Sequence, residues 1–359
     1  MDQNKILLDL IKFKTFEGYK NRYNEVSALY DYVKKHLSKK HYLFKELESN
    51  GYQSLIIYKE NYLKSELVLQ SHVDVVPGKP ELFNPKITAG KLFGRGAADM
   101  KFAVATYIKV LDELKNSKKD FAVWLTDDEE IGSENGVDYL LNKLNLKTNL
   151  CFLPDGASNT LITKAKGVIH FKWGAIGKSI HGSIPWEGIN AIDMLINAYL
   201  ELKDLAFFKM ADPNYWINSI NLGKISGGDA TNSVPQEAEM HIDIRFIDNT
   251  DYKKLLLSIN KITNNYRLHF EQEAYGSAYA LKFKDARVKK FIKALKYNNV
   301  VFKLEPEAGS TDARYFAEKN INSIIYKPLC DGEHADHEWL DLKSFKQFTQ
   351  ATIDWIKAL

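Results

Sequence analysis

Three segments of the chain contain short apolar runs, and each is followed by side chains that can bind a metal ion. The segments are SELVLQ (65–70), FAVWL (121–125) and LCFL (150–153). Such short apolar runs are typical of strands buried on both faces of a sheet. An amphipathic segment, 99–115, separates the first two and is predicted to be a helix. The alternation of strands and helices predicts an α/β fold with a mainly parallel sheet.

The middle of the chain has a different pattern. Residues 238–246 alternate apolar and polar side chains, as a strand with one buried face does. The whole region is predicted to have a β-α-β-β-α-β order, which fits a small α+β domain inserted into the larger one. The predicted elements are strands at 167–177, 217–225, 238–246 and 266–273 and helices at 188–205 and 250–264. We therefore expect a catalytic domain of residues 1–166 and 278–359 and an inserted domain of residues 167–277.

Composition excludes several classes of protein. The chain has 49 basic and 46 acidic residues among 359, a net charge of +3, which gives no electrostatic basis for nucleic-acid or membrane-surface binding. No stretch approaches the roughly 18 apolar residues of a membrane span. The amphipathic N-terminus does not resemble a signal peptide. Cys151 and Cys330 are too few for a disulfide framework and are predicted to be buried thiols. A cytoplasmic location is expected.

Metal-competent side chains follow each predicted strand of the larger domain. In an open α/β sheet, ligands collect outside the carboxyl ends of the strands, so these residues are expected to converge. Histidines and carboxylates without cysteine suit a catalytic zinc site, and cobalt or manganese also fits such a site. A two-metal site needs one bridging carboxylate and about two further ligands for each ion. The candidates are His72, Asp74, Asp99, Glu129, Glu130, Asp155, His334 and His337.

Several of these residues have simpler interpretations. Asp99 could be the N-cap of the helix that follows it. The acidic run 127–130 could be a solvated turn, although four acids directly after a buried strand repel one another unless cations compensate. Within that run, Asp127 and Asp128 are expected to be ordinary members. HEWLD (337–341) lacks the second histidine of a zincin motif.

Seven motifs occur in an order that resembles a known family. The chain is similar to the zinc amidohydrolases that include aminoacylase, acetylornithine deacetylase, succinyl-diaminopimelate desuccinylase and several di- and tripeptidases. The motifs span most of the chain, and their common order carries the resemblance. They are SHVDVVPG (71–78), GRGAADMK (94–101), TDDEEIGS (126–133), PDGAS (154–158), KSIHGSIPWEGINAI (178–192), GSTDARYF (309–316) and HADHEWL (334–340).

The resemblance implies a role for each metal-competent residue. One metal ion would be held by His72, Asp99 and Asp155, and the other by Asp99, Glu130 and His334, with Asp99 as the bridge. His334, not His337, has the spacing of the family. Asp74 would orient the His72 imidazole. Glu129 would be the general base, which takes a proton from the metal-activated water and later delivers it to the leaving amine.

The resemblance also implies substrate contacts and a dimer. His181, from the inserted domain of this subunit or of a partner, would stabilise the oxyanion, and Asn232 and Arg245 would face the substrate. The inserted domain would act as a lid and as the surface of a homodimer. Ser310 and Thr311 have two interpretations: they cap the helix at Asp312, or they bind a substrate carboxylate together with Arg314.

The predicted function is hydrolysis of an amide bond in a small peptide or an N-acyl amino acid by a di-zinc enzyme. The alternative is an N-succinyl or N-acetyl amino acid deacylase of amino-acid biosynthesis, of the desuccinylase or acetylornithine deacetylase type, which the short chain favours. Asp155 is a glutamate in many of these deacylases and an aspartate in several of the peptidases, which favours a peptidase. A catalytically idle binding protein is disfavoured because every expected ligand and Glu129 are present.

Overall fold

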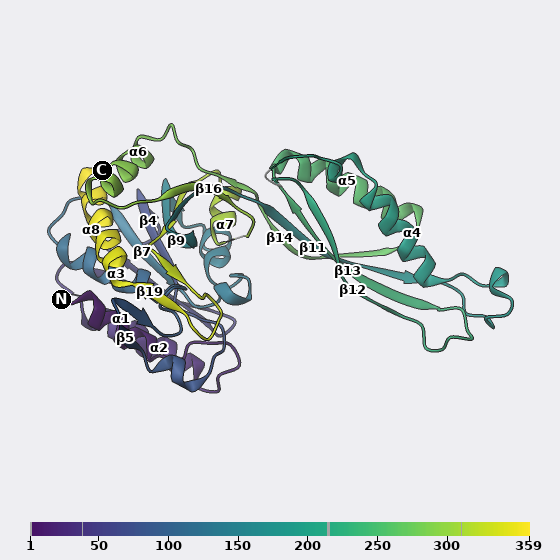
Figure 1. The fold of residues 1–359 in the computed structure, drawn as a ribbon, viewed down its shortest axis with the longest axis horizontal. Coiled ribbons are helices and arrows are strands. Elements are labelled where there is room, and N and C mark those ends of the chain that lie inside the picture. The colour runs from purple at the N-terminus through teal and green to yellow at the C-terminus, as the bar shows by residue number, and fades with distance from the viewer. Residues whose placement is uncertain (1, 38, 214–215, 310) are drawn as a thin grey trace. The chain divides into compact units, whose positions relative to one another are not determined.

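The computed structural model describes residues 2–37, 39–213, 216–309 and 311–359. The chain forms two compact units (Figure 1): unit 1 is residues 1–164 with 280–359, and unit 2 is residues 165–279. Each boundary lies two residues from the one expected from the sequence.

Unit 1 contains the predicted α/β elements. Its helices are α1 (Gln3–Ile11), α2 (Arg22–Lys35), α3 (Lys101–Glu113), α6 (Ala286–Tyr297), α7 (Ala313–Glu318) and α8 (Leu342–Ala358). Its first strands are β1 (Leu43–Ser49), β2 (Tyr52–Tyr58), β3 (Lys64–Ser65), β4 (Leu67–His72), β5 (Lys86–Thr88), β6 (Lys91–Phe93), β7 (Phe121–Thr126), β8 (Lys147–Thr148), β9 (Leu150–Ser158) and β10 (Thr160–Ala165). The later strands are β15 (Tyr279–Ala280), β16 (Lys303–Glu307), β17 (Asn322–Lys327), β18 (Cys330–Asp331) and β19 (Trp339–Asp341).

The largest sheet has a parallel centre and antiparallel edges. Its strands run in the order β1-β2-β7-β4-β9-β17-β10-β15, and β16 pairs with β10. The neighbours β7, β4, β9 and β17 pair in parallel, whereas β1, β2 and β10 pair antiparallel to their neighbours. The predicted mainly parallel sheet is therefore confirmed. Because the four central strands are parallel, the loops that follow them meet at one edge.

Helices cover both faces of this sheet. The register places Leu69 opposite Phe152 and Gln70 opposite Trp124, so Phe152 and Trp124 point to opposite faces. Phe152 stacks on Phe348 of α8, whereas Trp124 packs on Phe316 of α7. Since apolar residues pack on both faces of the sheet, β4 and β7 are fully buried, as their apolar sequences predicted.

The helix predicted from residue 99 begins later than expected. α3 starts at Lys101, Met100 occupies the cap position, and no side chain caps its first turn. The interpretation of Asp99 as the helix N-cap is therefore wrong, because its carboxylate oxygens face His72 and His334 instead.

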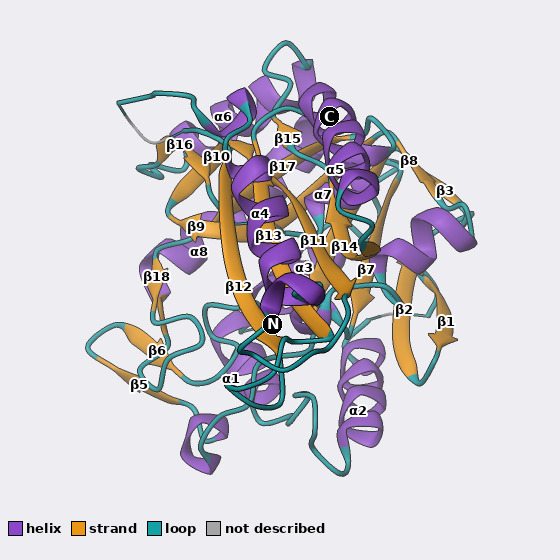
Figure 2. Cartoon of the chain, turned by 90° about the vertical axis from the view of Figure 1, so that its right-hand side faces the viewer, coloured by secondary structure: helices purple, strands orange, loops and turns teal. Residues whose placement is uncertain are grey.

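Unit 2 is a four-stranded antiparallel sheet with two helices. Its elements are β11 (Gly167–Ile176), α4 (Ala191–Lys203), β12 (Ser219–Gly227), β13 (Glu237–Phe246), α5 (Asn249–Asn265) and β14 (His269–Gly276). They follow the β-α-β-β-α-β order expected from the sequence, and the sheet order is β12-β13-β11-β14. Figure 2 shows α4 and α5 across this sheet, and apolar residues of both helices share one core with it.

The longest helices in the described ranges, α5 and α8, have 17 residues each. No helix in these ranges is long and apolar enough to cross a membrane.

Candidate metal centre

Asp99 lies between two histidines at the carboxyl edge of the central sheet. Its Oδ1 is 3.2 Å from Nε2 of His72, the last residue of β4. Its Oδ2 is 3.2 Å from Nε2 of His334, in the loop between β18 and β19. The two oxygens of one carboxylate thus face two different imidazoles, which is the arrangement that a bridging ligand requires.

Two groups of potential ligands share this carboxylate. The first group is His72, Asp99 and Asp155, and the second is Asp99, Glu130 and His334. Within each group the potential ligand atoms all lie within 4.8 Å of one another. These are the two sets that the sequence resemblance implied. Strands β4 and β9 and the segments before α3, after β7 and after β18 supply their residues.

Asp74 connects the two groups. The Nδ1 of His72 lies 3.0 Å from the carbonyl oxygen of Asp74 and 3.4 Å from its carboxylate. Asp74 Oδ2 also accepts a hydrogen bond of 2.9 Å from the backbone N–H of Glu130. Asp74 therefore fixes the His72 ring, with Nε2 facing Asp99, and the turn that carries Glu129 and Glu130.

Burial and crowding of negative charge dominate the electrostatics. Burial and the charge of Asp155 raise the pKa of Glu129 well above its usual value. Burial, together with the charge of Asp99, raises the pKa of Asp155 to about 7. Burial would also raise the pKa of Asp99, but hydrogen bonds from His334 and His72 outweigh it and hold that pKa low. Carboxylates packed this closely call for compensating positive charge.

The residues fit two divalent cations. Each group combines one imidazole with two carboxylates, a donor set typical of catalytic zinc and similar ions. Glu130 Oε1 is buried and has no hydrogen-bond partner among the described residues. Because a buried carboxylate oxygen without a partner is costly, a cation there would satisfy it.

Metal binding is expected to release protons. Hydrogen bonds to Asp99 and Glu130 raise the pKa of His334 to about 10, and at neutral pH its imidazole is therefore protonated without metal. A metal ion binds only the deprotonated form, so the apparent affinity should rise with pH, and at least about one proton should leave per protein at pH 7. Calorimetric titration with Zn²⁺ in two buffers of different ionisation enthalpy measures this number. A value of zero would contradict the proposed ligand set.

A pocket of about 690 Å³ opens on these residues. Both groups contribute to its lining through Asp99, Glu130, Asp155 and His334, and Glu129 lines it as well. The general-base candidate therefore shares one space with the candidate ligands, with room for a small substrate.

Asp127 and Asp128 are structural residues. Both are buried, which rules out the solvated-turn interpretation for them. Asp127 accepts a hydrogen bond from the backbone N–H of Gln53 and pairs with Arg22, whereas Asp128 accepts from the N–H groups of Asn135 and Gly136. They hold the loop that presents Glu129 and Glu130.

Glu338 is a supporting residue whose role the sequence did not reveal. One carboxylate oxygen accepts hydrogen bonds from the N–H groups of Gly96, Ala98 and Asp99. The other pairs with Arg95 Nη1 at 2.6 Å, and both side chains are buried. Glu338 thereby shapes the loop that carries Asp99. The only sequence signal was its spacing from His334.

Replacing Glu338 by alanine should destabilise the fold by about 3–5 kcal/mol, because the buried Arg95 would lose its ionic partner. Urea unfolding measures the change. The matched variant Glu305→Ala removes an exposed glutamate that lies 3.8 Å from Lys303 and should change stability by less than about 1 kcal/mol. Equal stabilities of the two variants would contradict this role.

The predicted substrate residues of unit 2 lie at two ends of its sheet. The carbonyl of Asn232 accepts a hydrogen bond from the N–H of Gly182, which places Asn232 beside the loop of His181, and both side chains are exposed. Arg245, near the far end of β13, pairs with Asp243 at 2.8 Å.

The predicted residues near α7 form intramolecular contacts. Thr311 Oγ1 accepts from the N–H of Ala313, as the capping interpretation expects. Arg314 donates to the carbonyl of Gly132. Ser310 lies outside the described residues, so neither interpretation of it is tested.

The remaining candidates lie outside the two ligand groups. His337 is exposed, and β19 occupies Trp339–Asp341, so HEWLD is not on a helix. Cys151 and Cys330 are buried free thiols, as predicted.

Comparisons with known proteins identify the family of the chain. The family model "Peptidase family M20/M25/M40" matches residues 68–358. A succinyl-diaminopimelate desuccinylase of Nautilia profundicola is 26% identical over 349 residues, which cover 91% of this chain and 92% of the relative. A tripeptidase of Staphylococcus aureus has a similar fold, with a TM-score of 0.78 at 20% identity, covering 100% of this chain and 98% of that one. An M20 family metallo-carboxypeptidase of Sulfolobus solfataricus gives a TM-score of 0.79 at 17% identity and covers 99% of both chains.

The family model covers most of the chain. The chain therefore belongs to peptidase family M20/M25/M40 and is a metallohydrolase of that family.

Proposed function

We propose that this metallohydrolase cleaves an amide bond in short peptides, with His72, Asp99, Glu130, Asp155 and His334 as ligands of two metal ions. The observation that carries the proposal is the carboxylate of Asp99, whose two oxygens lie 3.2 Å from the Nε2 atoms of His72 and His334. Members of the family usually bind two divalent ions. Zinc is the proposed native ion, because borderline ions suit imidazole and carboxylate ligands, as cobalt and manganese also do.

Each residue of the site has a proposed task. Two divalent ions there would polarise the scissile carbonyl and lower the pKa of water. Glu129 takes the proton from the attacking water and passes it to the leaving amine. Asp74 keeps His72 oriented. The position of Glu129 in the pocket wall gives it access to the substrate.

The substrate class has two candidates. Asp155 favours short peptides, because the resemblance places aspartate at this position in several peptidases. The sequence similarity to a desuccinylase over 91% of the chain favours N-succinyl or N-acetyl amino acids instead. Amine release from a panel of dipeptides, tripeptides and N-acyl amino acids by the zinc-loaded protein decides between them. Cleavage of the N-acyl compounds alone would overturn the peptidase proposal, and no cleavage of any amide by the metal-loaded protein would favour a binding protein.

We also propose that the enzyme is a homodimer in which unit 2 supplies His181 to the partner's active site. Arg245 is the ninth residue of β13, and Asn232 precedes its first residue. Eight strand residues span roughly 27 Å, too far for one small substrate to contact Arg245 and the His181–Asn232 loops of the same copy. Contact with both ends therefore requires two copies.

The free thiols support the expected cytoplasmic location.

A mixture of two inactive variants tests the shared site. Equal amounts of Glu129→Gln and His181→Ala subunits should form mixed dimers, half of the total, each with one complete site, and so recover about one quarter of wild-type activity. The measurement is turnover after unfolding and joint refolding, with each variant refolded alone as the control. No recovery in a mixture that contains mixed dimers would contradict the proposal.

A further inference from the structure

The loop that carries His334 is held in an unusual conformation. The backbone φ angle of His334 is +61°, and that of Gly332 is +76°. A residue with a Cβ atom is rare in this left-handed region, and holding it there costs free energy. The His334 side chain is also 56% exposed, so packing does not fix it. Other contacts must therefore hold this candidate ligand in place.

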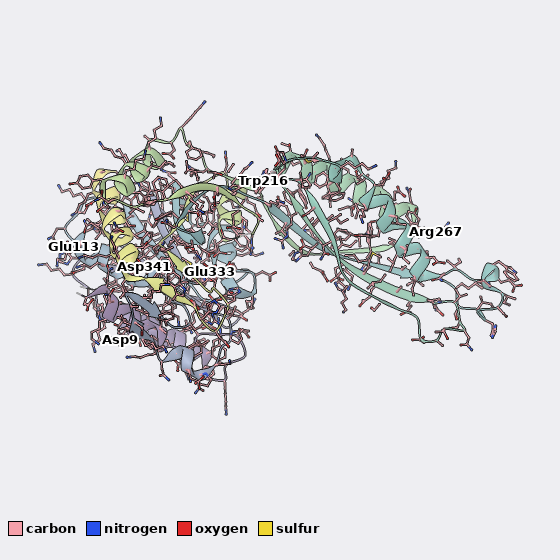
Figure 3. The ribbon with its side chains drawn as sticks, viewed as in Figure 1. Asp9, Glu113, Trp216, Arg267, Glu333 and Asp341 are labelled. Carbon is pink, nitrogen blue, oxygen red and sulfur yellow. The ribbon has the colours of Figure 1, made fainter. Side chains whose placement is uncertain are left out.

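A buried lysine contacts the residue next to His334. Lys327, the last residue of β17, has a side chain that is 1% exposed. Its Nζ donates to Oε1 of Glu333 at 2.6 Å. Glu333 is labelled in Figure 3, in the segment between β18 and β19 of unit 1. Lysine side chains are almost never fully buried unless they are paired, and Glu333 supplies the opposite charge here. The position of this ion pair next to His334 needs an explanation.

We propose that Lys327, acting through Glu333, is a positioning residue that holds His334 in place as a metal ligand. This inference rests on the proposed function of the Asp99, Glu130 and His334 group. An ammonium group has three donors and no lone pair, so Lys327 cannot itself bind the metal. The rigid strand β17 would instead anchor the loop through the Glu333 side chain. A second anchor, from Arg95 Nη2 to the carbonyl of His334 at 3.3 Å, holds the backbone.

The lysine could act in another way, by its charge alone. Burial raises the pKa of Asp155 overall, but the charge of Lys327 opposes that shift and also helps to hold the pKa of Asp99 low. Asp155 belongs to the first ligand group and Asp99 to both, so loss of the charge would change both ion sites. Loss of a tether to His334 would change only the second site. The two roles therefore differ in which ion is affected.

The chain offers a matched control pair on the same loop. Lys79 Nζ lies 2.6 Å from Oδ2 of Asp336, two residues after His334, just as Lys327 pairs with the residue before it. The distance is the same, but the Lys79 and Asp336 side chains are 70% and 58% exposed. An exposed pair of this kind contributes little, so it should not position His334.

The test is a metal titration of the full-length apoprotein with Co²⁺, followed by visible absorption and calorimetry. Lys327→Met and Glu333→Gln should each weaken one of the two sites by about 10- to 100-fold, the usual effect of losing a partner that orients a ligand. The Co²⁺ affinity of the other site should stay within about threefold of the wild-type value. Lys327→Arg should recover most of the lost affinity. The control variant Lys79→Met should bind both ions with wild-type affinity.

Three outcomes would overturn the proposal: equal weakening of both sites, a Lys327→Met protein with wild-type affinities, or a Glu333→Gln protein with wild-type affinities. If Lys327→Met does not fold, Glu333→Gln tests the same contact at a partly exposed position. His334→Ala separates this proposal from the proposed function. A His334→Ala protein that still binds two ions with wild-type affinity would show that the ligand assignment is wrong, whatever Lys327 does.

Discussion

Replacing Glu129 by glutamine is expected to lower kcat by about 10²- to 10⁴-fold while two metal ions remain bound. Glu129 is partly buried and lines the pocket together with Asp155, but it belongs to neither ligand group. Glutamine keeps the shape of the side chain but cannot accept and return a proton at neutral pH. The loss should therefore fall on kcat. Steady-state kinetics together with metal analysis of the same sample measures both quantities.

Glu134→Gln is the matched control for this variant. Glu134 lies on the same loop but is exposed and does not line the pocket. It should keep wild-type kcat. A Glu129→Gln enzyme with wild-type turnover would refute the general-base role. A Glu129→Gln protein that has lost an ion would instead assign Glu129 to the metal ligands.

The sequence predicted the two groups of residues that the structure brings together, because these residues lie in or after buried strands. The apolar segments ending near His72, Thr126 and Leu153 are typical of the central strands of a parallel sheet, and such strands end at a common edge. The topology therefore brings the two ligand groups together without any long-range information. The motif order supplied the roles, which periodicity alone could not.

The supporting residues were harder to predict because their roles depend on tertiary contacts. Asp127 and Asp128 looked like members of a solvated turn, yet both are buried and bind backbone N–H groups. Nothing local marks Lys327 as a buried cation, since its partner Glu333 lies in the turn that follows the next strand, β18. A charged residue in a sequence is normally assigned to the surface, and only the fold shows that this one is buried and which carboxylate pairs with it.

The cap predicted at Asp99 shows the same limit for a local rule. An aspartate just before an amphipathic segment is a common N-cap, and the helix does begin nearby, at Lys101. The two histidines come from distant parts of the chain, and their contacts fix the carboxylate in another direction. Local propensity located the helix, but tertiary contacts determined what the side chain does.

Replacing Asp99 by alanine is expected to weaken both metal sites, each by at least about 100-fold, because the loss of a ligand should cost no less than the loss of a residue that merely orients one. Asp99 is the one residue that belongs to both ligand groups among the described residues. His72→Ala should weaken only the first site and His334→Ala only the second. Co²⁺ titration of the three variants measures the pattern.

Asp112→Ala is the control, since Asp112 lies on α3 and pairs only with Lys115 among the described contacts. It should bind two ions as the wild type does. If Asp99→Ala lost one ion and kept the other at full affinity, Asp99 would be an ordinary ligand, and the two imidazoles would serve independent sites. Weakening of both sites by the single substitution Asp99→Ala is the result that only a shared ligand predicts. His72→Ala and His334→Ala should each weaken one site only. The comparison therefore tests the bridge itself, separately from the identity of the substrate.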